Sequence, residues 1–312
     1  MSFFLEKIRH FFTERPMPSA ALQLTPSYIG GIQINRREKK IRRHFILPLE
    51  KDVVVPSFSR KNIIKPDVLK ESFKEGMSRL QAGESHVACL IPETSLKAFV
   101  FDFDALPVSS REREDLFRFR VKKQMPLLQE NVRLSYDILP AGESIKSIVA
   151  LISGAVAREY EDFFQTFHLK VKALSVPTMC LLNFTLEDGI GSFILANLEE
   201  DVLTLVAVVE SKVVLYRQKP FAVEGAALPD PSRKRDNVIK EIDTTARFIR
   251  DRTGKKMEIL RLRAGFFDSR EDTLSSLEEG TGMKIERLNG QPGWGLNHFE
   301  REILSPLIGQ IG

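Results

Sequence analysis

A pattern of three short apolar runs occurs twice in this chain, and it limits the possible folds more than any other feature. The first copy spans residues 21–48 and turns at Thr25-Pro26-Ser27. The second copy spans 193–220 and turns at 197–201. In both copies, aliphatic and β-branched runs are separated by turn residues, which is typical of three strands in a meander. Two such meanders predict a duplicated fold.

The block of chain between the two copies alternates between strand and helix patterns. From residue 96 to 173 it predicts strand, helix, strand, strand, helix and strand. Ser109 can cap the first helix, and Phe117 and Val121 lie four residues apart on one of its faces. Pro126 ends this helix because it disfavours helical geometry in the residue before it. The alternation indicates an inserted α+β subdomain.

Helix and strand patterns alternate again after the second copy. A long helix is predicted at 236–252, where Thr253-Gly254 ends it, and a strand at 259–263. This order is typical of a mostly parallel sheet with helices between its strands. The remaining predicted elements are a helix at 269–279, a strand at 284–288 and a final helix at 298–308.

The two meanders and the block between them resemble the actin-like superfamily, which includes actin and hexokinase. Within the block, the runs 98–107, 134–139 and 148–154 and the step Gln124-Met125-Pro126 resemble the PilM family of type IV pilus assembly proteins. The resemblance implies an α/β fold of two actin-like (duplicated ribonuclease-H-like) halves with an inserted α+β subdomain. The implied division is an amphipathic N-terminal segment at 1–19, a first half at 20–95 and 174–190, an inserted subdomain at 96–173 and a second half at 191–312.

The turns that grip a nucleotide in the actin-like superfamily have lost their usual chemistry here. In the first turn, Gln23 brings no charge to hold magnesium and Pro26 removes an N–H group. The second turn, 197–201, carries three carboxylates. Each like-charge pair at about 4 Å could cost about 4 kcal/mol at an intermediate dielectric. The purine-binding turn, 263–267, has one glycine and two phenylalanines where the backbone must approach the base closely.

We therefore predict a degenerate nucleotide site, no catalytic residues and no enzymatic activity. The resemblance would supply ATP with magnesium as the cofactor, and the altered turns predict that neither is bound. An active actin-like ATPase, of the same system or of cell division, is the alternative. The positions that correspond to the nucleotide turns are Thr25, Ser27, Asn197 and Gly265.

No other catalytic or metal-binding pattern replaces the nucleotide site. The five histidines are scattered, with none at metal-pair spacing, and the sequence contains neither a Gly-x-Ser-x-Gly elbow nor a Walker loop. Asp102 and Asp104 alternate on one strand face, where a solvated surface is the simpler interpretation. Cys89 and Cys180 lie in apolar runs, which is typical of buried thiols in a reducing compartment. The missing acidic phosphate motifs also argue against a sugar or acid kinase.

Basic residues cluster in one turn of the first meander, although the net charge is only +4. One interpretation is a solvated turn. The other is attraction to anionic lipid headgroups, worth around 1 kcal/mol per basic residue near the surface. The cluster has no interleaved aromatic residues, so we predict no nucleic-acid partner. The residues assigned to a membrane surface are Arg36, Arg37, Lys39, Lys40, Arg42 and Arg43.

The first 19 residues predict an amphipathic segment. Phe4, Ile8, Phe11 and Phe12 fall on one helical stripe, which can dock on the body of the protein, on a membrane surface or on a partner. No apolar run reaches the roughly 18 residues that span a bilayer, and the start lacks a small-residue cleavage site. The expected location is cytoplasmic, peripheral at the inner face of the inner membrane.

The resemblance to the PilM family implies a scaffold in a type IV pilus or a related envelope-spanning machine. In that family, a groove beside the inserted subdomain holds an extended N-terminal peptide of an inner-membrane protein of the PilN type. Such a site pairs main chain with a strand edge and selects side chains in pockets. A further alternative is a homologue of the cytoplasmic domain of a type II secretion protein of the GspL type. The residues assigned to the partner site are Gln124, Met125, Pro126, Leu127 and Tyr136.

Overall fold

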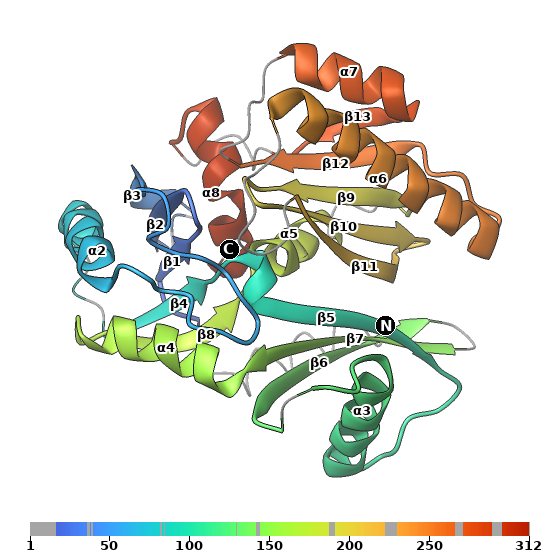
Figure 1. Ribbon diagram of the computed structural model, residues 1–312, viewed down its shortest axis with the longest axis horizontal. Coiled ribbons are helices and arrows are strands. Elements are labelled where there is room, and N and C mark those ends of the chain that lie inside the picture. Colours follow the sequence, from blue (N-terminus) through green and yellow to red (C-terminus); the bar gives the residue numbers. More distant parts are fainter. Residues whose placement is uncertain are drawn as a thin grey trace.

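The computed structural model contains two five-stranded sheets and a smaller three-stranded sheet beside them (Figure 1). The predicted stripe of Phe4, Ile8, Phe11 and Phe12 lies outside the described residues, as do Arg36, Arg37 and Lys39. The structure describes residues 17–35, 38, 40–81, 83, 85–128, 130–141, 144–186, 191–221, 230–265, 271–288 and 295–311.

The two large sheets have the same topology, which confirms the duplication predicted from the sequence. In each, three strands form an antiparallel meander, and the first strand pairs in parallel with the fourth, which pairs in parallel with the fifth. The first sheet, in the order β3-β2-β1-β4-β8, consists of β1 (Ala20–Leu24), β2 (Tyr28–Asn35), β3 (Lys40–Pro48), β4 (His86–Leu90) and β8 (Lys170–Ser175). The second, in the order β11-β10-β9-β12-β13, consists of β9 (Phe193–Leu198), β10 (Val202–Val209), β11 (Lys212–Pro220), β12 (Ile259–Ala264) and β13 (Lys284–Arg287).

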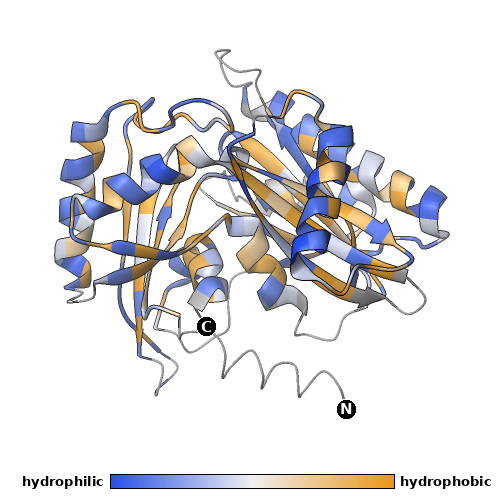
Figure 2. Cartoon of the chain, turned by 90° about the horizontal axis from the view of Figure 1, so that it is seen from below, coloured by the Kyte–Doolittle hydropathy of each residue, from blue (hydrophilic) through white to orange (hydrophobic). Residues whose placement is uncertain are grey.

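Both faces of each large sheet are covered, so the central strands are apolar on both sides (Figure 2). All eight residues of β10 are buried, including Thr204 within its otherwise aliphatic run. The helices differ from these central strands, because their outer faces are hydrophilic, as Figure 2 shows. The helices of the two halves are α2 (Pro66–Leu80), α4 (Gly154–Gln165), α5 (Pro177–Leu186), α6 (Pro231–Thr253), α7 (Glu271–Thr281) and α8 (His298–Ile311).

The inserted subdomain is the three-stranded sheet with one helix, α3 (Ser110–Gln124), on its outer face. Its strands are β5 (Leu96–Phe103), β7 (Ser144–Ser153) and β6 (Val132–Ala141), in that spatial order. In the structure, the inserted subdomain ends earlier in the chain than the predicted range of 96–173. Helix α4 packs in the core of the first half and β8 pairs with β4, so the chain has already returned to the first half at α4.

The last helix, α8, packs on the first half, although its place in the sequence assigned it to the second. It contacts α5, β1 and β2, and Leu304, Leu307 and Ile308 are buried among the apolar side chains of the first sheet. Helix α8 thus closes the face of the first sheet opposite α2 and α4. Within the described part of the chain, no helix has the length and apolar composition needed to cross a membrane.

Candidate functional site

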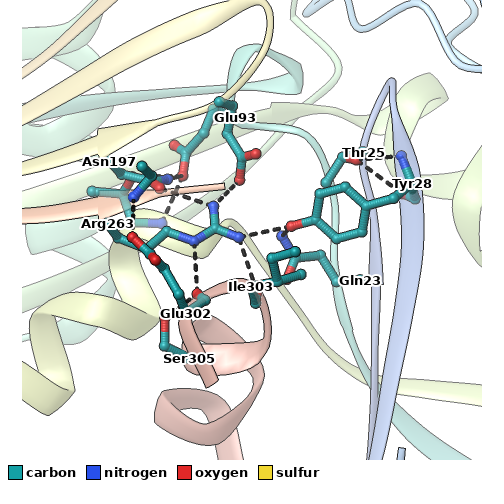
Figure 3. A network of polar contacts seen from close by, with 12 residues as sticks. Gln23, Thr25, Tyr28, Glu93, Asn197, Arg263, Glu302, Ile303 and Ser305 are labelled. Atoms are coloured by element: carbon teal, nitrogen blue, oxygen red, sulfur yellow. Dashed lines mark hydrogen bonds and ion pairs between the residues drawn. The ribbon is translucent and has the colours of Figure 1, made fainter. Parts of the chain in front are cut away.

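A fully buried arginine, Arg263 at the end of β12, lies between the two halves (Figure 3). A guanidinium has five N–H groups, and five contacts to acceptors satisfy this one. The acceptors come from the first half, the second half and α8, so the side chain joins all three. They are Tyr28 Oη at 2.7 Å, Asn197 Oδ1 at 3.0 Å, Glu199 Oε1, the carbonyl oxygen of Glu302 at 3.2 Å and that of Ile303 at 2.9 Å.

A proline inside α8 makes one of these acceptors available. Pro306 has no N–H group, so the carbonyl of Glu302, four residues earlier, has no backbone donor within the helix. Arg263 Nε and Ser305 Oγ donate to this carbonyl at 3.2 and 2.8 Å. A buried carbonyl without a donor costs about 1–3 kcal/mol, and here the Ser305 hydroxyl and Arg263 together replace the missing backbone donor.

Burial controls the protonation of this network. It raises the pKa of Tyr28, so the phenol stays neutral while its oxygen accepts from Arg263 and from Gln23 Nε2 at 2.8 Å. Burial alone would lower the pKa of Arg263, but the charge of Glu199 and the contact with Tyr28 more than offset it, and the pKa is raised. The guanidinium is therefore charged and paired with Glu199 inside the protein.

Gly265, which the resemblance placed in the purine-binding turn, lies against this ion pair. A Cβ atom added at Gly265 would lie 2.5 Å from Glu199 Oε2 and 3.2 Å from Arg263 Nη1. Glycine at this position leaves room for the ion pair. The phenylalanines that follow, Phe266 and Phe267, lie outside the described residues.

A second buried carboxylate, Glu93, extends the network into the junction with the inserted subdomain. It lies in a short 3-10 helix (Glu93–Ser95) between β4 and β5. Its Oε2 accepts from Tyr216 Oη of β11 at 2.9 Å, and burial raises its pKa. Its Oε1 accepts from Thr178 N and Oγ1, both at 2.6 Å, and from Asn197 Nδ2 at 3.1 Å. Asn197 therefore connects the Glu93 cluster to Arg263.

The first predicted nucleotide turn is satisfied by its own side chain. Thr25 is 2% exposed, and its Oγ1 accepts from Tyr28 N at 2.9 Å and Ser27 N at 3.3 Å and donates to Tyr28 O at 2.8 Å. Both the hydroxyl and these two amides are therefore engaged within the turn. Thr25 and Asn197 lie on the same polar network, while Ser27 takes part only through its amide.

Two cations contact the second turn, one at a carboxylate and one at a backbone carbonyl. Glu199 pairs with Arg263, whereas Lys234 Nζ donates to the carbonyl of Glu200 at 2.5 Å. Burial raises the pKa of Asp201 to about 7, and Glu199 adds to the increase while Lys234 opposes it. Burial lowers the pKa of Lys234 to about 8.

Sequence reasoning missed Arg263 and Glu93 as members of a site. One signal was available: Arg261 and Arg263 alternate with leucines on a strand flanked by helices, where a buried arginine requires partners. The partners themselves were not visible, because Tyr28 lies 235 residues away in the sequence.

A cavity of about 480 Å³ lies between the inserted subdomain and the first half. One wall is β6, of which five consecutive residues, 133–137, line the cavity. The lining also includes Leu174 of β8, Met179 and Leu182 of α5, Gln310 of α8, and Val213 of β11 in the second half. Both β6 and β8 contribute to the lining and are outer strands of their sheets, and residues of the central strand β7 line the cavity as well.

The free edge of β6 presents the backbone of alternate residues. Gly154 N donates to Asn131 O at 2.8 Å, which fixes the phase of the β6–β7 ladder. Because alternate residues of an antiparallel strand bond to the same neighbour, residues 133, 135 and 137 bond to β7. The N–H and C=O groups of Leu134 and Tyr136 therefore point away from the sheet.

The residues assigned to the partner site divide into two groups. Tyr136 lines the cavity, with its ring centroid 4.5 Å from that of Phe117 on α3. The segment Gln124 to Leu127 at the end of α3 is not part of the cavity lining, and Leu127 is 97% exposed. Of the basic residues assigned to a membrane surface, Lys40 and Arg42 are exposed on β3, an outer strand, and Arg43 is half-buried.

Comparison with known proteins identifies the fold. No protein-family model and no curated protein sequence matches the chain. The structure is similar to a PilM–PilN type IV pilus biogenesis complex, with a TM-score of 0.75 and 12% identity over 96% of this chain and 100% of the other. It is also similar to a Bacteroides thetaiotaomicron protein with an actin-like ATPase fold, with a TM-score of 0.56 and 12% identity over 92% and 95% of the two chains.

The chain has the actin-like fold. The predicted fold class is confirmed, and the likeness to PilM extends over nearly the whole chain. A third similar structure is the cytoplasmic domain of EpsL, an inner-membrane component of the type II secretion system of Vibrio cholerae. Its TM-score is 0.53, with 10% identity over 93% of this chain and 94% of the other.

Proposed function

We propose that this protein is a scaffold at the cytoplasmic face of the inner membrane, in a type IV pilus or a related secretion machine. Its partner in this proposal is an inner-membrane protein of the PilN type, which contributes an extended segment. The observation that carries the proposal is the cavity between the inserted subdomain and the first half, which the outer strands β6 and β8 help to line. The likeness in fold to a PilM–PilN complex supports this choice of partner.

The proposed binding mode is the addition of a strand to the free edge of β6. Main-chain groups of Leu134 and Tyr136 would pair with the segment, and alternate side chains of the segment would enter the cavity. The lining of the cavity is mainly aliphatic and includes Leu174, Met179 and Leu182 of the first half. We therefore expect a segment with apolar side chains at every second position.

The second part of the proposal is that the nucleotide site is degenerate. Its support is that the Thr25 hydroxyl and two amides of the first turn are engaged within that turn, and that Arg263 with Glu199 occupies the interior between the turns. The Arg263 network then performs the role of a bound ligand, which is to hold the two halves together. An active ATPase of the same system is the alternative, and it requires magnesium-dependent binding of ATP.

Strand addition is tested with two substitutions at one residue. Tyr136→Ala and Tyr136→Pro both remove the ring that packs on Phe117, but only Tyr136→Pro also removes the outward N–H group. Proline is tolerated at such a position because the lost donor does not belong to the β6–β7 ladder. Affinities are measured by calorimetry with synthetic N-terminal peptides of the inner-membrane proteins encoded beside this chain.

We expect Tyr136→Pro to bind at least roughly fivefold more weakly than Tyr136→Ala, since one hydrogen bond contributes about 1 kcal/mol. Circular dichroism checks that both variants fold. Equal affinities in the two variants would exclude pairing at this edge. Leu127→Asp tests the predicted contact at the end of α3 separately, because Leu127 lies outside the cavity lining.

A further inference from the structure

The open part of the β6 edge is short, because local contacts close it at both ends. At one end, Val132 N donates to the carbonyl of Glu130 at 3.1 Å, and Arg118 Nη1 donates to the carbonyl of Val132 at 3.5 Å. At the other end, Ile138 N donates to Asp137 Oδ1 at 2.9 Å. Among the described residues, no group accepts from the outward amides of Leu134 and Tyr136. The docking edge is therefore limited to residues 134–136.

The charges beside this edge are unequal. Arg133 and Asp137 are the charged residues of the cavity lining, and they lie on the same face of β6 because they are four residues apart. Arg133 is neutralised by Glu161, with Nη2 to Oε2 at 2.8 Å and a second contact between Nη1 and Oε1. Asp137 forms no ion pair among the described residues. The edge therefore carries one uncompensated negative charge, at its Asp137 end.

The lysine diagonal to Asp137 on the neighbouring strand pairs with a different carboxylate. Lys146 lies on β7 opposite Leu139, diagonal to Asp137, and its Nζ contacts Asp102 Oδ1. Arg252 of α6 contacts the other oxygen of Asp102 at 3.0 Å. The charge of Asp137 thus remains available to a molecule in the cavity mouth, where this side chain is exposed.

We propose that Asp137 determines which segments dock, by pairing with a lysine or arginine of the docked strand. This inference rests on the proposed function of the cavity. In a docked strand, the residues opposite Ser135 and opposite Asp137 are two positions apart. Their side chains therefore lie on the same face of the extended sheet. Ser135 lines the cavity together with Leu174 and Met179, so we expect the docked side chain opposite Ser135 to contact these two apolar residues. The partner segment accordingly carries an apolar residue and a basic residue separated by one position.

The test selects displayed random dodecamer peptides on the full chain and on three variants. Asp137→Asn keeps an oxygen that can accept from Ile138 N but removes the charge, and Asp137→Lys reverses it. Asp67→Lys is the matched control, since this carboxylate is 91% exposed on α2, away from the cavity. A representative selected peptide is then measured by calorimetry at low and high salt.

We expect the unchanged chain and Asp67→Lys to enrich apolar–x–basic peptides, and Asp137→Lys to enrich apolar–x–acidic ones. Asp137→Asn should weaken the selected peptide roughly two- to fivefold, as for an exposed ion pair. The role of Asp137 would be refuted in two cases: if the selected peptides show no preference for a basic residue, or if the same basic preference persists on Asp137→Lys. If these peptides still bind Tyr136→Pro more weakly than Tyr136→Ala, the docking site itself remains intact. A chain that enriches no peptide would overturn both the docking site and this inference.

Discussion

Removing the guanidinium of Arg263 is the most demanding perturbation that this structure offers. In Arg263→Met, Glu199 keeps a buried charge without its partner, and Tyr28, Asn197 and two carbonyls of α8 each lose a donor. Loss of one partner of a buried ion pair costs about 3–5 kcal/mol. Total stabilities are about 5–15 kcal/mol, so we expect the variant to lose a large part of its free energy of unfolding. Urea unfolding followed by circular dichroism measures the loss.

Two further variants separate the buried charge from a general effect of substitution. Arg247→Met removes a comparable side chain whose ion pair with Asp243 is exposed, and it should cost less than about 1 kcal/mol. The double variant Arg263→Met with Glu199→Gln removes both buried charges and should recover at least about half of the loss. If Arg263→Met costs no more than Arg247→Met, the network does not hold the halves together and the reasoning is refuted.

Three other predictions follow from the turns and from β3. Burial raises the folded-state pKa of Asp201 to about 7, so folding favours its protonated form. The contribution of Asp201 to the free energy of unfolding therefore falls as the pH rises from about 4 to 7. Asp201→Asn should remove this part of the pH dependence, which urea unfolding at several pH values measures. Calorimetry with ATP and magnesium should detect no binding at physiological concentration, and a magnesium-dependent dissociation constant in the micromolar range would restore the ATPase interpretation. In vesicle flotation, the chain should associate weakly with anionic lipid, and only at low salt. The double variant Lys40→Glu with Arg42→Glu should reduce the fraction recovered with the vesicles. Equal recovery with neutral and anionic lipid would mean that these residues form only a solvated strand surface.

The fold could be predicted because its signals are local. Aliphatic runs such as that of β10 and the Gly254 that ends α6 depend on neighbouring residues alone, and the structure has the strand and the helix end where these signals place them. The boundary of the inserted subdomain could not be read in this way. The sequence of β8 contains no local signal that this strand pairs with β4 of the first half.

The candidate site was only partly predictable, for the same physical reason. The turns at Thr25 and Asn197 were found because their departures from the expected motif are visible in sequence order. Arg263 was not found because its partners lie from 39 to 235 residues away. Its acceptor on α8 depends on a missing N–H group at Pro306, which identifies a free carbonyl but not the donor that reaches it.

The position of α8 has a consequence for the order in which the protein can be completed during synthesis. Helix α8 (His298–Ile311) covers the first sheet, whose first strand is Ala20–Leu24, and it supplies two acceptors to Arg263. The first strand emerges from the ribosome early, yet its sheet keeps one apolar face open until residues 298–311 have also emerged. Contacts of such long sequence separation form slowly. The first half therefore lacks its complete core until the second half has been made.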